Sequence, residues 1–184
     1  MIDLSKYLKK YQPLIESEEI QLKLNNFGVL LESIKASHGR LLLFGNGAAA
    51  SIASHAALDF TKQGKLTSLC FHDAALLTAY ANDYGYENAH KEIIKNHYQK
   101  GDLCIFISVS GESPNIVRAA EYCDSQNYPT VSFSGRKKDN ALSKLTQESF
   151  WVDSEAYNIV ENVHSIWLLS MVDYLIGKDV YEVS

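Results

Sequence analysis

Short apolar runs alternate with amphipathic stretches along most of this chain. Five runs have strand length, and they cover residues 41–44, 68–71, 103–108, 130–134 and 150–152. Between and after them, apolar residues recur every three or four positions, which predicts helices over 48–62, 86–99, 113–126 and 158–176. Strands that alternate with helices predict an α/β fold, in which both faces of a parallel sheet are covered by helices.

The first part of the chain differs, because it carries helical spacing without a strand. Over residues 2–37 the apolar positions, among them Leu24, Phe27 and Leu31, predict an amphipathic helical arm (1–37) ahead of an α/β core (38–184). No repeat or linker divides the chain, so residues 1–184 are expected to form a single domain. The arm's apolar stripe would be exposed on a monomer, which predicts burial against another subunit.

Composition limits the classes of binding partner and the cellular compartment that we expect for this chain. The chain has 184 residues, 46% of them hydrophobic, with a net charge of -5, so it offers no broad basic surface for nucleic acid. The N-terminus lacks the apolar core of a signal peptide, and no run reaches the length of a membrane span. Cys70, Cys104 and Cys123 have no metal-type spacing. Cys70 and Cys104 lie within apolar runs of strand length and are expected to be buried thiols in a reducing compartment. We therefore expect a cytoplasmic protein.

The strongest candidate for chemistry is the segment that follows the third apolar run. Ser108, Ser110 and Ser113 surround Gly111 and precede Pro114, which suits the first turn of a helix. Hydroxyl groups beside the free N–H groups of a helix N-terminus form a binding site for an anion such as phosphate. The alternative is an ordinary helix N-cap at a strand-to-helix turn.

Polar residues also follow the other strands, at the sheet edge where ligands of open parallel sheets bind. Asn46 and Gly47 follow the first strand, residues 81–88 follow the second, and residues 153–164 follow the last. The Gly-x-Gly pair at Gly45 lacks the third glycine and the distal acid of a dinucleotide site, so no nucleotide cofactor is expected.

Two carboxylate–imidazole pairs share a helix face. His55 and Asp59 are four residues apart, and Glu161 and His164 are three apart. Such pairs suit proton transfer beside a carbonyl, and they also suit a zinc ion. The alternatives are a core histidine with a surface acid, and an acid that only stabilises a helix N-terminus.

Taken in order, these segments resemble the sugar isomerase (SIS) domain family, of the phosphoheptose isomerase type. The resemblance rests on five segments: Gly45-Asn-Gly, His55-Ala-Ala-Leu-Asp59, Ala81-Asn-Asp-Tyr-Gly-Tyr86, Ser108-Val-Ser-Gly-Glu-Ser113 and the closing helix. It implies a flavodoxin-like three-layer sandwich that assembles as a homotetramer, with active sites at subunit interfaces. It also implies conversion of sedoheptulose 7-phosphate to D-glycero-D-manno-heptose 7-phosphate, for the heptoses of lipopolysaccharide, capsule or other surface glycans.

The resemblance also assigns roles to individual residues. The implied substrate-binding residues are Asn46, Gly47, Ala48, Asn82, Asp83, Ser108, Val109, Ser110, Ser113 and Glu161. The implied zinc ligands are His55, Asp59 and Glu161. Asp59 stands where the family has a glutamate, Glu161 where glutamine is common, and Leu169 where a second catalytic histidine is expected.

These departures leave several functions open. As an isomerase, the chain would use Asp59 or Glu161 as the base, with Glu161 or His164 replacing the histidine lost at Leu169. Helical phase places Glu161 and His164 along one stripe, so both are expected to face the pocket. The alternatives are a non-catalytic SIS module that binds a phosphosugar or a protein, for example the replication initiator, and an isomerase of another sugar phosphate.

Overall fold

The computed structural model describes residues 1–182 and has an α/β architecture. Its strands are β1 (Leu41–Gly45), β2 (Ser68–Cys70), β3 (Leu103–Ser108), β4 (Thr130–Gly135) and β5 (Glu148–Val152). Its helices are α1 (Leu4–Leu8), α2 (Gln12–Ile15), α3 (Glu18–Ala36), α4 (Ala48–Lys62), α5 (Ala74–Tyr84), α6 (Tyr86–His97), α7 (Pro114–Ser125), α8 (Ala141–Leu145) and α9 (Tyr157–Ile176).

The strands form one parallel sheet in the order β2-β1-β3-β4-β5. The chain therefore leaves β1 toward one edge, returns, and continues from β3 toward the other. The connection that leaves β1 and the connection that leaves β3 therefore run in opposite directions. Ligands of open α/β sheets bind at such a point, outside the carboxyl ends of the strands. This confirms the flavodoxin-like fold expected from the sequence.

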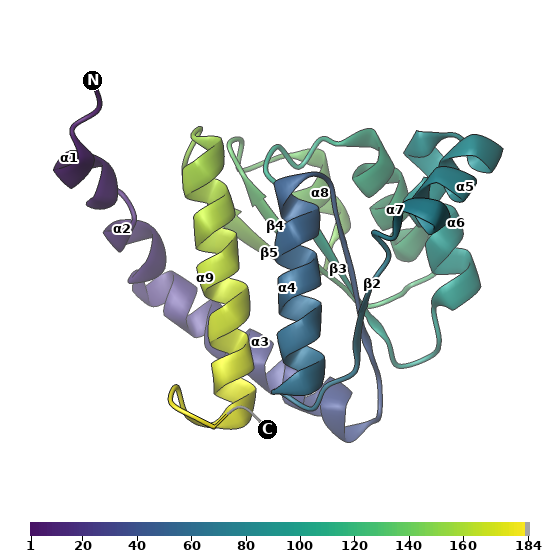
Figure 1. Cartoon of the computed structure of the whole chain (residues 1–184), viewed down its shortest axis with the longest axis horizontal. Coiled ribbons are helices and arrows are strands. Elements are labelled where there is room, and N and C mark those ends of the chain that lie inside the picture. Colours follow the sequence, from purple (N-terminus) through teal and green to yellow (C-terminus); the bar gives the residue numbers. More distant parts are fainter. Residues whose placement is uncertain (183–184) are drawn as a thin grey trace.

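Helices cover both faces of the sheet. On one face, α3, α4 and α9 pack over a core that includes Leu43, Ile105 and Phe133. On the other, α6, α7 and α8 pack over Leu42 and Phe106. Figure 1 shows α4 and α9 side by side, both starting at the carboxyl end of the sheet. The central strands β1, β3 and β4 are buried on both faces, which explains why they are predominantly apolar in sequence.

The N-terminal segment is less uniform than the single arm expected. It forms three helices, of which α3 belongs to the core of its own chain. Phe27 on α3 lies 6.0 Å from the ring of Phe133 and 5.4 Å from that of Phe150. Helices α1 and α2 contain no buried residue and extend to one side of the molecule (Figure 1). Only this short part of residues 1–37 is free to contact another subunit over most of its surface.

Helix α9 is long and apolar enough to span a membrane by length and composition alone. Its position in the fold gives another reason for that composition. Val163, Trp167 and Leu168 are buried between the sheet and the neighbouring helices α3 and α4. Such a helix is the core helix of a three-layer sandwich.

Candidate functional site

The serine segment forms a tight turn between β3 and α7. The backbone N–H of Gly111 donates to the carbonyl of Ser108 at 3.0 Å, and the backbone N–H of Glu112 donates to Ser110 Oγ at 3.2 Å. Ser108 Oγ donates to Ser113 Oγ at 3.3 Å. The three hydroxyls therefore lie around the N-terminus of α7, as the sequence predicted for an anion site.

Gly111 is required at the centre of this turn for two reasons. Its φ of +64° lies in the left-handed region, which residues other than glycine rarely adopt. A Cβ there would also overlap the side chain of Asn140. Asn140 is buried and fixed, because its Nδ2 donates to Ser134 Oγ and its Oδ1 accepts from the backbone N–H of Ser143. The close approach of Gly111 to Asn140 holds the serine turn at one distance from the sheet.

A cavity of about 160 Å³ lies beside the turn, at the carboxyl ends of β1 and β3. Its lining residues are Asn46, Ala49, Ile107, Ser108, Val109, Ser110, Ser113, Tyr157 and Glu161. The strand register explains why Asn46 belongs to it, since Gly45 pairs with Ile107 and the next residues along the two strands are Asn46 and Ser108. Asn46, Ser108, Val109, Ser110, Ser113 and Glu161 were predicted substrate residues, and the structure brings them together.

Hydrogen bonds from two helices hold the Asn46 side chain. Its Oδ1 accepts from Tyr86 Oη at 2.9 Å and from Asn115 Nδ2 at 2.8 Å, and its Nδ2 donates to Asn115 Oδ1 at 2.9 Å. Sequence reasoning missed Asn115, although a polar residue within the buried face of α7, two positions after Ser113, is a signal that could have found it. It also missed Tyr157, which is the first residue of α9.

Glu161 is the one carboxylate among the residues that line this cavity. It lies in the second turn of α9 and also borders a neighbouring groove, which is lined in addition by Tyr7, Tyr11 and Leu169. Leu169 does not line the cavity of the serine turn. A hydrocarbon side chain therefore stands in the groove, two turns along α9 from Glu161.

The prediction that His164 faces the pocket is not met. The imidazole is fully buried in the core, where its Nε2 lies 3.0 Å from the carbonyl oxygen of Ser134, and burial lowers its pKa to about 4. A spacing of three residues rotates the side chain by about 60° around the helix. That rotation carries His164 from the cavity rim, where Glu161 lies, into the interior, so a direct role in proton transfer is not supported.

The second pair, His55 and Asp59, lies on α4 with Nε2 and Oδ2 3.2 Å apart. Asp59 is eleven residues beyond Ala48, which corresponds to about 16 Å along the helix. Burial raises the pKa of Asp173 on α9, and the charges of Asp179 and then of Asp59 raise it further, so Asp59 lies near Asp173. Asp173 lies twelve residues, or about 18 Å, along α9 from Glu161. Asp59 and Glu161 of one chain are therefore far apart.

This separation bears on the expected zinc ion. Within residues 1–182, no three His, Cys, Asp or Glu side chains are grouped closely enough to hold a metal. His55 and Asp59 supply two ligands, and the structure does not bring Glu161 to them. The residues of a single chain consequently do not fit a zinc site, which needs at least three protein ligands.

The remaining predicted substrate residues do not line the cavity. Gly47 and Ala48 are exposed at the start of α4. Asn82 and Asp83, in the polar segment expected after the second strand, lie near the end of the exposed helix α5, where Asn82 Nδ2 donates to Asp83 Oδ1 at 2.9 Å. They come shortly before Tyr86 in the chain, but their side chains contact each other.

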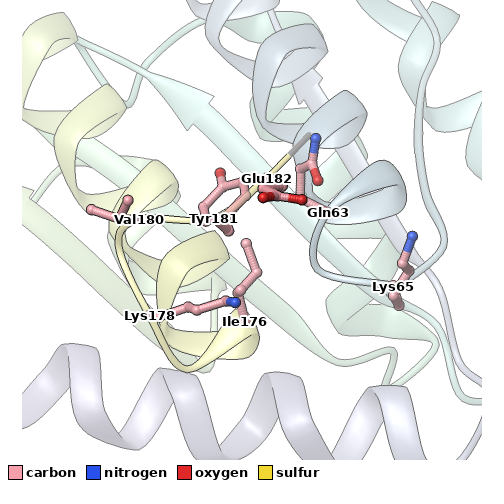
Figure 2. Close-up of a pocket in the computed structure, with 7 residues that line it drawn as sticks. All are labelled: Gln63, Lys65, Ile176, Lys178, Val180, Tyr181 and Glu182. Atoms are coloured by element: carbon pink, nitrogen blue, oxygen red, sulfur yellow. The ribbon is translucent and has the colours of Figure 1, made fainter. Parts of the chain in front are cut away.

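A second hollow, of about 550 Å³, lies where α4 and α9 end (Figure 2). Gln63 and Lys65 line one side of it, and Ile176 and Tyr181 line the other. This end of the molecule is opposite the serine turn, and the hollow contains none of the predicted site residues. The cavity at the serine turn is therefore the candidate site.

Known proteins resemble this chain in sequence and in fold. Phosphoheptose isomerase 2 of Campylobacter jejuni is 34% identical over 142 residues, 73% of this chain and 70% of that protein. Phosphoheptose isomerase of Thermodesulfovibrio yellowstonii is 34% identical over 132 residues, 68% of this chain and 65% of that protein. The structure of phosphoheptose isomerase from Neisseria gonorrhoeae has the same fold, with a TM-score of 0.84 over 95% of both chains at 20% identity.

The fold and the site define an α/β protein with a hydroxyl-lined cavity at the switch point of its sheet. The sequence model of the SIS domain family matches residues 6–135 of this chain. The chain belongs to the SIS domain family and, within it, to the phosphoheptose isomerases, which confirms the resemblance drawn from the sequence.

Proposed function

We propose that this chain is an aldose–ketose isomerase that converts sedoheptulose 7-phosphate to D-glycero-D-manno-heptose 7-phosphate. The observation that carries the proposal is the cavity itself, in which the serine turn and a single carboxylate, Glu161, face the same space. The relatives named phosphoheptose isomerase support this substrate over other sugar phosphates. The product suits the synthesis of surface glycans.

The phosphate binds at the serine turn. The hydroxyls of Ser108, Ser110 and Ser113 donate to its oxygens, together with free backbone N–H groups at the start of α7. These donors carry no full charge, so binding depends on their number and on the rigidity that Gly111 and Asn140 give the turn. Phosphate held at one end fixes the open-chain sugar relative to Glu161.

Glu161 acts as the base of the isomerisation. Its carboxylate removes a proton from the carbon beside the ketone, which leaves an enediolate. The resulting carboxylic acid exchanges this proton with solvent and then protonates the neighbouring carbon. The hydroxyl proton passes between the two oxygens, so the reaction needs no oxidant or reductant. The amide N–H of Asn46 is placed to stabilise the negative oxygen of the intermediate.

His55 and Asp59 enter the reaction only if a second copy of the chain supplies them. We expect a homotetramer in which the serine turn and Glu161 of one subunit face the His55–Asp59 pair of another. Exposed apolar side chains on the N-terminal helices and on α4, including Leu4, Leu8 and Leu58, support such an assembly. A zinc ion would need this composite site, and no step above depends on one. We expect the assembly to be soluble and cytoplasmic.

The reaction can be tested by NMR in deuterated water with sedoheptulose 7-phosphate, with and without added zinc. We expect deuterium at the carbon next to the carbonyl, together with an aldose signal. Glu161→Gln should lower turnover by a factor of about 100 or more, because it removes the base, while inorganic phosphate still binds. Glu148→Gln, at the exposed start of β5 and so at the opposite end of the sheet from the cavity, is the control and should turn over as the wild type does.

A different outcome would support a second function. Leu169 stands in place of a histidine expected from the family, and this favours a module that binds a phosphosugar without converting it. Binding of sedoheptulose 7-phosphate with no deuterium exchange in the wild-type protein would establish that function instead. Unchanged turnover in Glu161→Gln would remove Glu161 from the mechanism.

A further inference from the structure

The hydrogen bonds of Asn46 point to a function for two residues that lie behind the cavity. We propose that Tyr86 and Asn115 are positioning residues, which hold Asn46 so that one N–H of its amide faces the sugar part of the ligand. The inference rests on the proposed function, because it assumes a sugar phosphate in the cavity.

Counting donors and acceptors defines what Asn46 can offer. A side-chain amide oxygen accepts two hydrogen bonds, and the amide nitrogen donates two. Tyr86 Oη and Asn115 Nδ2 occupy both acceptor sites of Oδ1, at 2.9 and 2.8 Å, and one N–H is given to Asn115 Oδ1 at 2.9 Å. One N–H remains, so the side chain meets a ligand as a donor only.

The two amides also lock each other. Because each donates to and accepts from the other, neither can rotate by 180° without breaking both bonds unless its partner rotates too. Asn115 is only 2% exposed, so water cannot replace the bonds it would lose. Tyr86 Oη adds a third tie from α6, and Asn46 is thereby joined to two helices as well as to the end of β1.

Asn46 would otherwise be free to move. It is followed by Gly47, which has a φ of +55° and no atoms within 4 Å of the place a Cβ would occupy. An unrestrained side chain in such an open place would lose rotational freedom when it binds a ligand, and this loss would weaken binding. Fixing the amide before the ligand arrives removes that cost and places the donor in advance.

The sugar, rather than the phosphate, is the partner of the free N–H. Ser108, Ser110, Ser113 and the start of α7 surround the phosphate position from one loop. Asn46 comes from the neighbouring strand, and Glu161 lines the same cavity. A donor from β1 therefore meets the carbon chain that runs from the phosphate toward Glu161.

Tyr86→Phe tests the proposal, because it removes only the hydroxyl from a half-exposed side chain. Calorimetry would measure binding of sedoheptulose 7-phosphate and of inorganic phosphate, with Glu161→Gln present in every variant to prevent turnover. We expect affinity for the sugar phosphate to fall about fivefold, the effect of one lost hydrogen bond. Affinity for inorganic phosphate should stay within about twofold of that of the parent, the protein that carries Glu161→Gln alone.

Tyr84→Phe is the matched control. Tyr84 is 50% exposed and Tyr86 is 51% exposed, and among the described residues the Tyr84 hydroxyl makes no hydrogen bond. Both ligands should bind this control as they bind the parent. Asn115→Leu provides a second variant, because a hydrocarbon side chain of similar volume cannot donate to Asn46 Oδ1 and adds no charge beside the phosphate. We expect it to reproduce the selective loss, while thermal unfolding shows that the protein is folded.

Each remaining outcome decides between two failures. Equal loss of affinity for both ligands in Tyr86→Phe, or no loss for either, overturns the positioning role. If the parent binds the sugar phosphate but the wild type does not convert it, the proposed isomerase function fails while the selective loss still supports the positioning role. If neither ligand binds the parent, both proposals fail.

Discussion

Two buried histidines make the fold sensitive to acid. His90 and His164 are fully buried, and neither ring nitrogen of His90 has a hydrogen-bond partner among the described residues. Burial lowers the pKa of His90 to about 4, with a smaller contribution from the charge of His72. Burial likewise lowers the pKa of His164 to about 4, against a hydrogen bond to Ser134 that raises it.

The two groups should reduce stability as pH falls from 6.5 to 4. Between pH 6.5 and pH 4 these histidines bind protons in the unfolded chain but not in the folded chain. Their contribution to the free energy of unfolding is therefore complete above pH 6.5 and is lost as the pH falls to 4. Each histidine accounts for about 3 kcal/mol over the whole range and about 2 kcal/mol between pH 7 and pH 5. Urea denaturation at several pH values measures this loss. His90→Phe should flatten the profile, and an unchanged profile in that variant would show that His90 does not cause it.

Gly111→Ala should disrupt the serine turn. The new side chain requires a left-handed φ and overlaps Asn140, so we expect a loss of about 2–4 kcal/mol in the free energy of unfolding. Binding of inorganic phosphate should also weaken. Gly177→Ala is the control, since Gly177 has a φ of +79° but no neighbour within 4 Å of the added Cβ, and only the backbone penalty of about 1 kcal/mol applies.

At the scale of elements, Asp102 joins the beginnings of β1 and β3. Its buried carboxylate accepts from the backbone N–H and the guanidinium of Arg40 and from the backbone N–H of Gln99. Arg40 in turn donates to the carbonyl of His97, at the end of α6. One ion pair therefore fixes two strands and a helix at the edge opposite the cavity.

Asp102→Asn should cost about 2 kcal/mol in chemical denaturation, because the partly buried guanidinium of Arg40 loses the charge of its buried partner. Asp139→Asn removes an exposed carboxylate, 3.8 Å from Lys144, and should change the free energy of unfolding by less than about 0.5 kcal/mol. Equal effects of the two substitutions would contradict a special contribution from the buried pair.

The central strands β1, β3 and β4 were predictable from the sequence because they are buried on both faces, and the partly exposed edge strands β2 and β5 were predictable from their short apolar runs. The predicted 103–108 agrees with β3, and the other four runs differ from their strands by one or two residues at an end. Helix α5 was not predicted. It contains no buried residue and contacts mainly α6, so its sequence lacks the period of a helix that packs on a core. Residues 81–84 consequently looked like part of a loop.

The site was predictable where its residues follow directly from strand ends. Ser108 and Asn46 lie beside each other because their strands pair in register. His164 could not be placed in this way, since its distance from the cavity depends on the rotation of α9 against the sheet. The contact of Asn46 with Tyr86 joins residues forty positions apart, and no periodicity in the sequence encodes it.

For the whole molecule, a composite site predicts that two inactive variants restore each other. Glu161→Gln and Asp59→Asn damage opposite halves of a site formed by two subunits. Mixed subunits, dissociated and reassembled in equal amounts, would contain about one intact site in four. We expect about a quarter of wild-type turnover from the mixture, measured by the NMR assay, and almost none from either variant alone.

A second mixture serves as the control. Ser110 and Glu161 line the same cavity of one chain, so Ser110→Ala mixed with Glu161→Gln leaves no intact site. Recovery of activity in this control, or its absence in the first mixture, would argue against a site that two chains share.

The cavity draws on residues from Asn46 to Glu161, so its lining is complete only when the last helix has formed. On the ribosome, most of the chain must emerge before Tyr157 and Glu161 can join the serine turn. A ligand that binds only this finished cavity stabilises completed chains and gives no protection to shortened ones. Proteolysis in the cell would then remove truncated copies selectively whenever the ligand is abundant.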